Sequence, residues 1–340
     1  MVSPPPPAWD LGRFWQTVQY FGALPGMTLW QQWWGQQTHL AVATVLLVGI
    51  PDHLRQGLEP ALAARGYRVA TLNFPLNTPD LSAHMPLAGV VVWTDLPPAV
   101  GETLIPYLPS DPVVFDFGRP AAALGDLWGA LDDVVMGGVS SSGLVLEPGA
   151  ARFRGTVSTA NNGGFASVRT RNLNPALNLA GTAGLWLHLR GDGQRYKLLI
   201  RTDSGWDSLA YALSFDTQPG VWQTVDLPFA HFVPVFRAKT VPDAPPLDAR
   251  RLRSFQVMLS KFEYDGGLNP HFQAGAFSLE IAQLGVRGRP AVPWGLLVAP
   301  GTRPHAWEAQ LAEAGITAQP IRVASDLSQW VQQVVVFLAQ

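Results

Sequence analysis

Apolar runs alternate with amphipathic stretches near both ends of the chain. In the first part, the apolar runs are residues 42–50, 68–74 and 88–95. An amphipathic stretch that ends near Gly66 lies between the first and the second run. The same texture returns after residue 290, with an apolar run followed by helical patterns at 305–314 and from Asp326. Runs of this length separated by amphipathic helices predict buried parallel strands in a β-α-β arrangement.

The middle of the chain has a different period. From about residue 116 to 288, apolar and polar residues alternate between glycine-rich turns, which predicts a β-sandwich. The turn sequences at 161–165 and 191–194 predict hairpins. Pairing Arg190 with Arg195 in the second hairpin gathers the apolar residues on one face, namely Leu185, Leu187, Leu189, Tyr196, Leu198 and Ile200.

The order of these hydrophobic patterns along the chain predicts that the sandwich interrupts a Rossmann-like α/β domain. We therefore expect an α/β plus all-β protein in four segments. They are a Trp-rich helical segment at 1–39, the first part of the Rossmann-like domain at 40–115, the sandwich at 116–289, and the rest of the Rossmann-like domain at 290–340.

Residues 9–37 combine aromatic residues at helical spacing with almost no charge, which predicts two short helices around Pro25 and Gly26. Two interpretations stay open. The aromatic side chains dock on the protein's own core, or they lie in a membrane interface, where indole rings favour the headgroup region. The side chains of the second interpretation are Phe14, Trp15, Phe21, Trp30, Trp33 and Trp34.

The β-α-β start lacks the residues that hold a dinucleotide. If Gly49 is the first glycine of the fingerprint, the later glycines are replaced by Asp52 and Arg55. A carboxylate at that position repels a pyrophosphate. The second strand also ends without the acidic residue that binds a ribose. We expect a degenerate fold without a cofactor.

The amino-acid composition and the spacing of potential ligands and nucleophiles argue against several classes of functional site. The chain has no cysteine, and its seven histidines show no metal-binding spacing. Residues 138–142 narrowly miss the nucleophile elbow of a serine hydrolase. No catalytic residue and no metal ligand is therefore predicted.

The stretch LDDVVMGGVSSSG at 131–143 concentrates acids, glycines and serines. Our interpretation is that the glycines allow a tight backbone path while Asp132, Asp133 and the serines hydrogen-bond neighbouring amides. A bound ligand or partner at these residues is the alternative.

A basic and aromatic sheet surface is the predicted site for a partner. Residues 119–290 hold 17 basic and 14 acidic side chains, whereas the rest of the chain holds 6 and 11, so the basic excess lies in the sandwich. An acidic protein or RNA suits such a surface, and a merely solvated face is the alternative. Its residues are Phe165, Arg169, Arg171, Trp186, His188, Arg190, Arg195, Lys197 and Arg201.

Four motifs carry a family resemblance. LDDVVMGGVSSSG, FRGTVSTANNGGFASVRTR, LRGDGQRYKLLIRT and WQTVDLPFAHFVP occur in this order between residues 131 and 234. They resemble the complex I intermediate-associated protein family, the thirty-kilodalton assembly factor of respiratory complex I. The resemblance implies a galactose-binding-like jelly roll without catalytic residues. The insertion into a short-chain-dehydrogenase-like domain is similar to a cyanobacterial and plastid branch linked to photosystem II biogenesis.

The resemblance implies a non-enzymatic assembly factor for a membrane-bound electron-transfer complex, either photosystem II or an NADH-dehydrogenase-type complex I. Its partners would be subunits or assembly intermediates, reached from the cytoplasmic or stromal side of a thylakoid-type membrane by peripheral contact, and DNA is not expected as a partner. The alternatives are an RNA-binding translation factor, an atypical short-chain-dehydrogenase oxidoreductase and a carbohydrate-binding module.

Overall fold

The computed structural model describes the chain in ten stretches. They are residues 10–21, 43–73, 87–97, 99–105, 111–120, 124–205, 207–288, 290–314, 316–323 and 326–338. The chain forms two compact units. The first contains residues 1–40, 115–176 and 183–285, and the second contains residues 41–114, 177–182 and 286–340.

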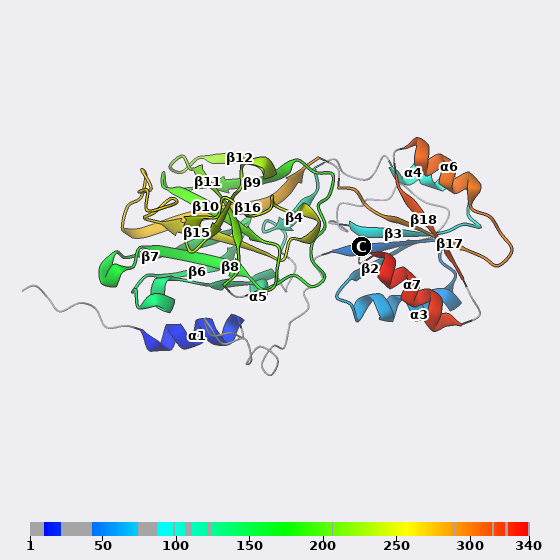
Figure 1. The fold of residues 1–340 in the computed structure, drawn as a ribbon, viewed down its shortest axis with the longest axis horizontal. Helices are drawn as coiled ribbons and strands as arrows, with labels where there is room; N and C mark the ends of the chain where they lie inside the picture. The colour runs from blue at the N-terminus through cyan, green and yellow to red at the C-terminus, as the bar shows by residue number, and fades with distance from the viewer. Residues whose placement is uncertain are drawn as a thin grey trace, which may run out of the picture. The chain divides into compact units, whose positions relative to one another are not determined.

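The first unit is a sandwich of two sheets (Figure 1). The seven-stranded sheet has the order β14 (Lys239–Thr240), β13 (Val233–Phe236), β11 (Ala210–Asp216), β10 (Arg195–Arg201), β15 (Ser254–Ser260), β8 (Phe165–Thr170) and β5 (Trp128–Ala130). The six-stranded sheet has the order β12 (Trp222–Pro228), β9 (Gly184–Arg190), β16 (Gly275–Arg287), β7 (Ala150–Val157) and β6 (Ser141–Glu147), and β4 (Val113–Asp116) pairs with β16. The predicted β-sandwich is confirmed.

Short helices complete this unit. They are α1 (Leu11–Phe21), α5 (Leu124–Leu127), η3 (Asp133–Met136), η4 (Ala160–Asn162), η5 (Phe229–His231) and η6 (Ala249–Arg251).

Both predicted hairpins are wrong. Strand β9 pairs with β12, whereas β10 pairs with β11 and β15 in the other sheet. Likewise, residues 161–165 connect β7 of one sheet to β8 of the other. The leucines of β9 and the predicted inward side chains of β10, Tyr196, Leu198 and Ile200, are all fully buried, so the predicted inward faces are right. A period of two determines which face of a strand is buried, but it is the same for strands that pair within a sheet and strands that stack across a core.

The second unit is a parallel sheet with helices on both faces (Figure 1). Its strands in chain order are β1 (Thr44–Val48), β2 (Arg68–Leu72), β3 (Leu87–Trp93), β17 (Trp294–Val298) and β18 (Ala318–Arg322). Helices α3 (Asp52–Ala63) and α7 (Leu327–Leu338) pack on one face. Helices α4 (Ala99–Leu104) and α6 (His305–Glu313) pack on the other. The sandwich sequence therefore interrupts an α/β unit, as expected.

The strand order β2-β1-β3-β17-β18 is the doubly wound order 2-1-3-4-5 of flavodoxin-like domains. In the usual dinucleotide-binding order, the third strand lies beyond the second. Here β3 lies on the opposite side of β1 from β2. In open sheets of this kind, a ligand occupies the crevice outside the carboxyl ends of the two strands where the order reverses, which are β1 and β3.

A side chain of the protein itself lies against the residue that follows β1 at this crevice. Gly49, which follows β1, has φ of 61°, and a Cβ atom built on it would lie 2.3 Å from Cδ1 of Leu96. The indole Nε1 of Trp307 in α6 donates a hydrogen bond to the Leu96 carbonyl at 3.0 Å, which holds this loop in place. At the start of α3, Arg55 pairs with Asp52 at 2.5 Å. A pyrophosphate would have to displace Leu96 and approach the Asp52 carboxylate.

We expect the purified protein to bind NADH and NADPH no more tightly than millimolar, because both sterics and charge oppose the phosphates at the end of β1. Isothermal titration calorimetry measures this directly, and a micromolar dissociation constant would restore the oxidoreductase alternative.

Candidate functional site

Asp133 connects three parts of the sandwich. It is fully buried at the start of η3. Its carboxylate accepts hydrogen bonds from the Ser140 amide at 2.9 Å and hydroxyl at 2.7 Å, and from the amides of Gly164 at 2.7 Å and Phe165 at 3.3 Å. Asp133 therefore joins the approach to β6 to the loop that enters β8.

Asp132 makes a second set of bonds beside the first. Its carboxylate accepts from the amides of Ser142 at 2.8 Å and Ser167 at 3.0 Å. Arg13 of α1 lies 3.2 Å from it. Burial raises the pKa of Asp132, and the hydrogen bonds from Ser142 and Ser167 oppose that rise. The interpretation of this motif as a hydrogen-bonded turn is confirmed.

Two glycines leave room for the Asp133 carboxylate. A Cβ atom on Gly138 would lie 2.3 Å from its Cγ and Oδ1, and one on Gly163 would lie 2.4 Å from its Oδ2. Because no side chain fits at either position, the acid and the two glycines form one structural unit. This unit holds residues 162–165 at the edge of the cleft described next.

A cleft of about 380 Å³ lies on the outer face of the seven-stranded sheet. Its apolar wall is a cluster of Leu199, Ala210, Ala212, Val235 and Met258 from β10, β11, β13 and β15. Exposed apolar side chains lie at its rim, among them Met136, which is 70% exposed, and Phe262, which is 37% exposed. The cleft is large enough for a few apolar side chains of a partner.

Cationic side chains also line this cleft. Arg169 is 3% exposed, and its strand neighbour across the β8–β15 pair is Gln256. The Nη1 atom of Arg201 donates to Oε1 of Gln256 at 2.9 Å. Burial lowers the pKa of Arg201 to about 10. Burial, followed by the nearby charge of Arg201, lowers the pKa of Arg169 well below its usual value. The charges of Asp203 and Asp207 oppose the lowering of both pKa values, and an anionic group of a partner would act in the same direction.

Lys197 holds the rim of the cleft. It is 4% exposed, and its Nζ donates hydrogen bonds to the carbonyls of Phe262 and Glu263, the latter at 2.7 Å. The ammonium also lies 4.8 Å from the centre of the Tyr264 ring. Burial lowers the pKa of Lys197 from 10.5 to about 8, although the Glu263 carboxylate opposes this. Lys197 therefore fixes residues 262–264.

The pKa of Lys197 predicts a pH dependence of stability. Between about pH 8 and about pH 10, the unfolded chain binds more protons at this amine than the folded chain does, so the free energy of unfolding rises with pH. We expect a rise of about 2 kcal/mol from about pH 7 to about pH 9.5. Urea unfolding measures it, and the variant Lys197→Met should lack most of the rise. Parallel pH profiles of the two proteins would contradict the assignment.

The outer face of the six-stranded sheet carries the other predicted aromatic residues. His188 of β9 stacks on Trp222 of β12, with ring centroids 5.2 Å apart. Arg190 lies over the same indole at 5.2 Å and pairs with Glu280. Trp186 covers Gly285, where a Cβ atom would lie 2.3 Å from the indole.

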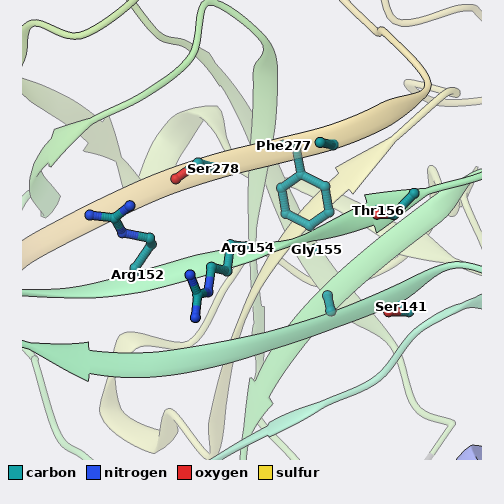
Figure 2. Close-up of a pocket in the computed structure, with 9 residues that line it drawn as sticks. Ser141, Arg152, Arg154, Gly155, Thr156, Phe277 and Ser278 are labelled. Carbon is teal, nitrogen blue, oxygen red and sulfur yellow. The ribbon is translucent and has the colours of Figure 1, made fainter.

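A second hollow lies on this face. Figure 2 shows Arg152 and Arg154 projecting from β7, with Ser278 on the adjacent strand β16. Arg152 pairs with Glu147 at 2.8 Å and with Glu280 at 2.9 Å. Arg154 is exposed. Because carboxylates neutralise most of its arginines, this face offers little net charge to a partner.

The predicted basic surface is therefore two surfaces, and the expectation of a single face is wrong. Phe165, Arg169, Lys197 and Arg201 line the cleft of one sheet. Trp186, His188 and Arg190 belong to the other sheet. Arg195 pairs with Asp216 at 2.7 Å and with Glu263 at 3.2 Å. Arg171 follows β8 and lies 4.3 Å over the Tyr20 ring of α1. The error follows from the hairpin that was expected between β9 and β10.

Helix α1 docks on the sandwich. The Tyr20 hydroxyl donates to the Asp126 carbonyl at 2.7 Å, and its ring covers Gly129 of β5. Phe14 and Phe21 are half-buried, whereas Trp15 is 51% exposed. The first interpretation of residues 9–37, in which the aromatic side chains dock on the protein's own core, is thus confirmed for part of this segment. Trp30, Trp33 and Trp34 lie outside the described residues. Within the described stretches, we find no helix with the length and apolar content to span a bilayer.

The described residues contain no group of three histidine or acidic side chains that could bind a metal ion. The serines of the motif donate to buried carboxylates. Ser140 bonds Asp133, and Ser142 bonds Asp132 at 2.5 Å. Neither serine has a histidine partner among its recorded hydrogen bonds. This arrangement stabilises loops, and we assign no catalytic role to it.

Gln256 and the rim residues Phe262 and Tyr264 belong to the cleft but were absent from the predicted site. In the sequence, Gln256 lies in the apolar strand SFQVMLS, where one polar residue inside a buried run was the available signal. The rim could not be found from the sequence, because its residues reach the cleft through the pairing of β10 with β15.

Sequence comparison gives one family. The model of complex I intermediate-associated protein 30 matches residues 115–281. An uncharacterized protein of the fission yeast Schizosaccharomyces pombe is 31% identical over 162 residues, which cover 43% of this chain and 74% of the relative.

Among solved structures, the family 11 carbohydrate-binding module of the cellulase Lic26A-Cel5E of Clostridium thermocellum has a TM-score of 0.38 and 12% identity, covering 52% of this chain and 94% of the module. The module CsCBM6-3 of Clostridium stercorarium, solved with cellobiose, has a TM-score of 0.24 and 7% identity, covering 47% of this chain and 93% of the module. At these values neither module bears on what this chain binds.

Proposed function

Because the chain belongs to the complex I intermediate-associated protein 30 family, we propose that it is a non-enzymatic assembly factor that holds a client protein in the cleft of its sandwich. The observation that carries the proposal is a cleft with apolar walls and buried cations. Such a lining suits the temporary binding of a protein surface that is buried in a finished complex.

The client we propose is a subunit or an assembly intermediate of an NADH-dehydrogenase-type complex I, and the description of the family supports it. Photosystem II is the second candidate, because of the insertion in an α/β unit. The protein would act on the cytoplasmic or stromal side of a thylakoid-type membrane. Trp15 and Leu11, on the exposed side of α1, are candidates for peripheral contact with that membrane.

RNA receives less support as a partner. Binding to phosphates requires cations that solvent and phosphate can reach. In the sandwich, Arg169 and Lys197 are buried, and Arg152, Arg190 and Arg195 pair with carboxylates. The salt dependence that marks a phosphate partner is therefore expected to be shallow.

The test is affinity purification of the tagged full chain from detergent-solubilised membranes, with mass spectrometry of the recovered proteins. We expect enrichment of subunits of one electron-transfer complex, and nuclease treatment should leave their recovery unchanged. Recovery of ribosomal proteins that disappears on nuclease treatment would favour the RNA alternative and contradict the proposal.

A further inference from the structure

The cleft combines three properties. Its wall is apolar, its lining includes five cationic side chains and two carboxylates, and two of those cations, Arg169 and Arg201, lie next to Gln256. Both carboxylates already have partners. Asp207 bonds Arg237 at 2.9 Å, and Glu263 bonds Arg195 at 3.2 Å.

Arg201 is the cation whose hydrogen-bonding capacity is least used. Its recorded hydrogen bond joins Nη1 to Gln256. Its Nε atom is buried and has no hydrogen-bond partner among the residues that the structure describes. The donors that remain are the second N–H of Nη1, both N–H groups of Nη2 and that of Nε. The planar edge of a guanidinium binds the two oxygens of a carboxylate side by side.

Arg201 is half-buried, and the charges of Asp203 and Asp207 oppose only part of the effect of its burial. At neutral pH Arg201 nevertheless keeps its charge, since burial lowers its pKa only to about 10. A ligand with a carboxylate would offset the charge of Arg201 directly. The apolar wall of Leu199, Val235 and Met258 would cover the atoms that flank that carboxylate.

We propose that the cleft recognises a glutamate or aspartate side chain within an otherwise apolar segment of the client, with its carboxylate on the guanidinium of Arg201. This inference rests on the proposed function for the identity of the occupant as a protein. Charge complementarity selects the acid, and the exposed apolar rim at Met136 and Phe262 selects its apolar neighbours.

The test uses the full chain and a random peptide library displayed on phage. We expect the enriched peptides to share one acidic residue among apolar residues. Replacing that acid by its amide in a synthetic peptide should weaken binding about 10- to 100-fold, as should Arg201→Gln in the protein. The matched control is Arg154→Gln, which removes the same charge from an exposed site on the other sheet and should bind like the wild type.

Arg201→Gln should also fold as well as the wild type, because it removes a half-buried charge and keeps a polar partner for Gln256. A thermal melting curve checks this. If Arg201→Gln unfolds, Arg201→Lys replaces it, since lysine keeps the charge and lacks the planar edge, and weaker peptide binding by a folded Arg201→Lys supports the proposal.

Two kinds of result would overturn the proposal. One is a result with peptides, either enrichment of peptides without an acidic residue or equal binding of the acidic peptides to wild type and Arg201→Gln. The other is binding of decanoate that is tighter than the peptides and displaces them, which would assign the cleft to a free amphiphile. In either case, recovery of complex subunits from membranes by the same protein would leave the assembly role standing, so the two failures are distinguishable.

Discussion

Replacing Asp133 by alanine should cost the sandwich about 4 kcal/mol or more of its free energy of unfolding. The substitution removes a buried carboxylate that accepts four hydrogen bonds, from Ser140 twice and from Gly164 and Phe165. Hydrogen bonds to a charged group each contribute about 1.5–3 kcal/mol, and the buried amides would be left without an acceptor. A loss of this size is a large part of the stability of a typical domain.

The measurement is urea unfolding followed by near-ultraviolet circular dichroism, with Asp243→Ala as the matched control. Asp243 is exposed and makes no recorded interaction, so its replacement should change stability by less than about 0.5 kcal/mol. If two transitions are resolved, Asp133→Ala should move only one of them. Equal midpoints for the two variants would show that the carboxylate does not hold the loops, and the ligand interpretation of this motif would then return.

Replacing Gly138 by alanine should lower the free energy of unfolding by about 2–3 kcal/mol. The added methyl group would lie 2.3 Å from the Asp133 carboxyl group, which its hydrogen bonds to Ser140, Gly164 and Phe165 hold in place. The matched control is Gly143→Ala, five residues further along the same motif. A Cβ atom there meets nothing within 4 Å, so we expect no loss and a small gain from the stiffer unfolded chain.

Thermal unfolding of the two glycine variants side by side makes the comparison. A melting temperature of Gly138→Ala at or above that of Gly143→Ala would mean that the loop moves aside at little cost. The acid would then not be held in one position by its neighbours.

The sequence could predict those features of the fold that depend on the local pattern of apolar and polar residues. The alternation in Leu185–Leu189 and Tyr196–Ile200 indicated the buried faces of β9 and β10, and all of these inward side chains are fully buried. The partner of each strand could not be predicted, because a connection such as residues 191–194 can lead to the neighbouring strand or to the opposite sheet. The order of the parallel strands in the second unit could not be predicted either. It depends on the pairing of β1 with β3, which are far apart in the sequence.

The candidate site was predicted in part for the same reason. Arg169, Lys197 and Arg201 share a face because β8, β15 and β10 are adjacent in the sheet, and period-two alternation indicated that face. The burial of Lys197 was not predicted, since it depends on contacts of its ammonium with Phe262 and Tyr264. Because Arg169 and Lys197 are buried, we expect that replacing either side chain lowers the free energy of unfolding.

The central claim is that the cleft holds a client protein during assembly, and one comparison tests it most directly. Tagged wild type, Arg201→Gln and Arg154→Gln are purified from membranes at equal abundance, and the co-purified subunits are quantified by mass spectrometry. We predict that Arg154→Gln recovers the subunits at the wild-type level, whereas Arg201→Gln recovers about tenfold less while melting at the same temperature or higher. Equal recovery by both variants would contradict the claim.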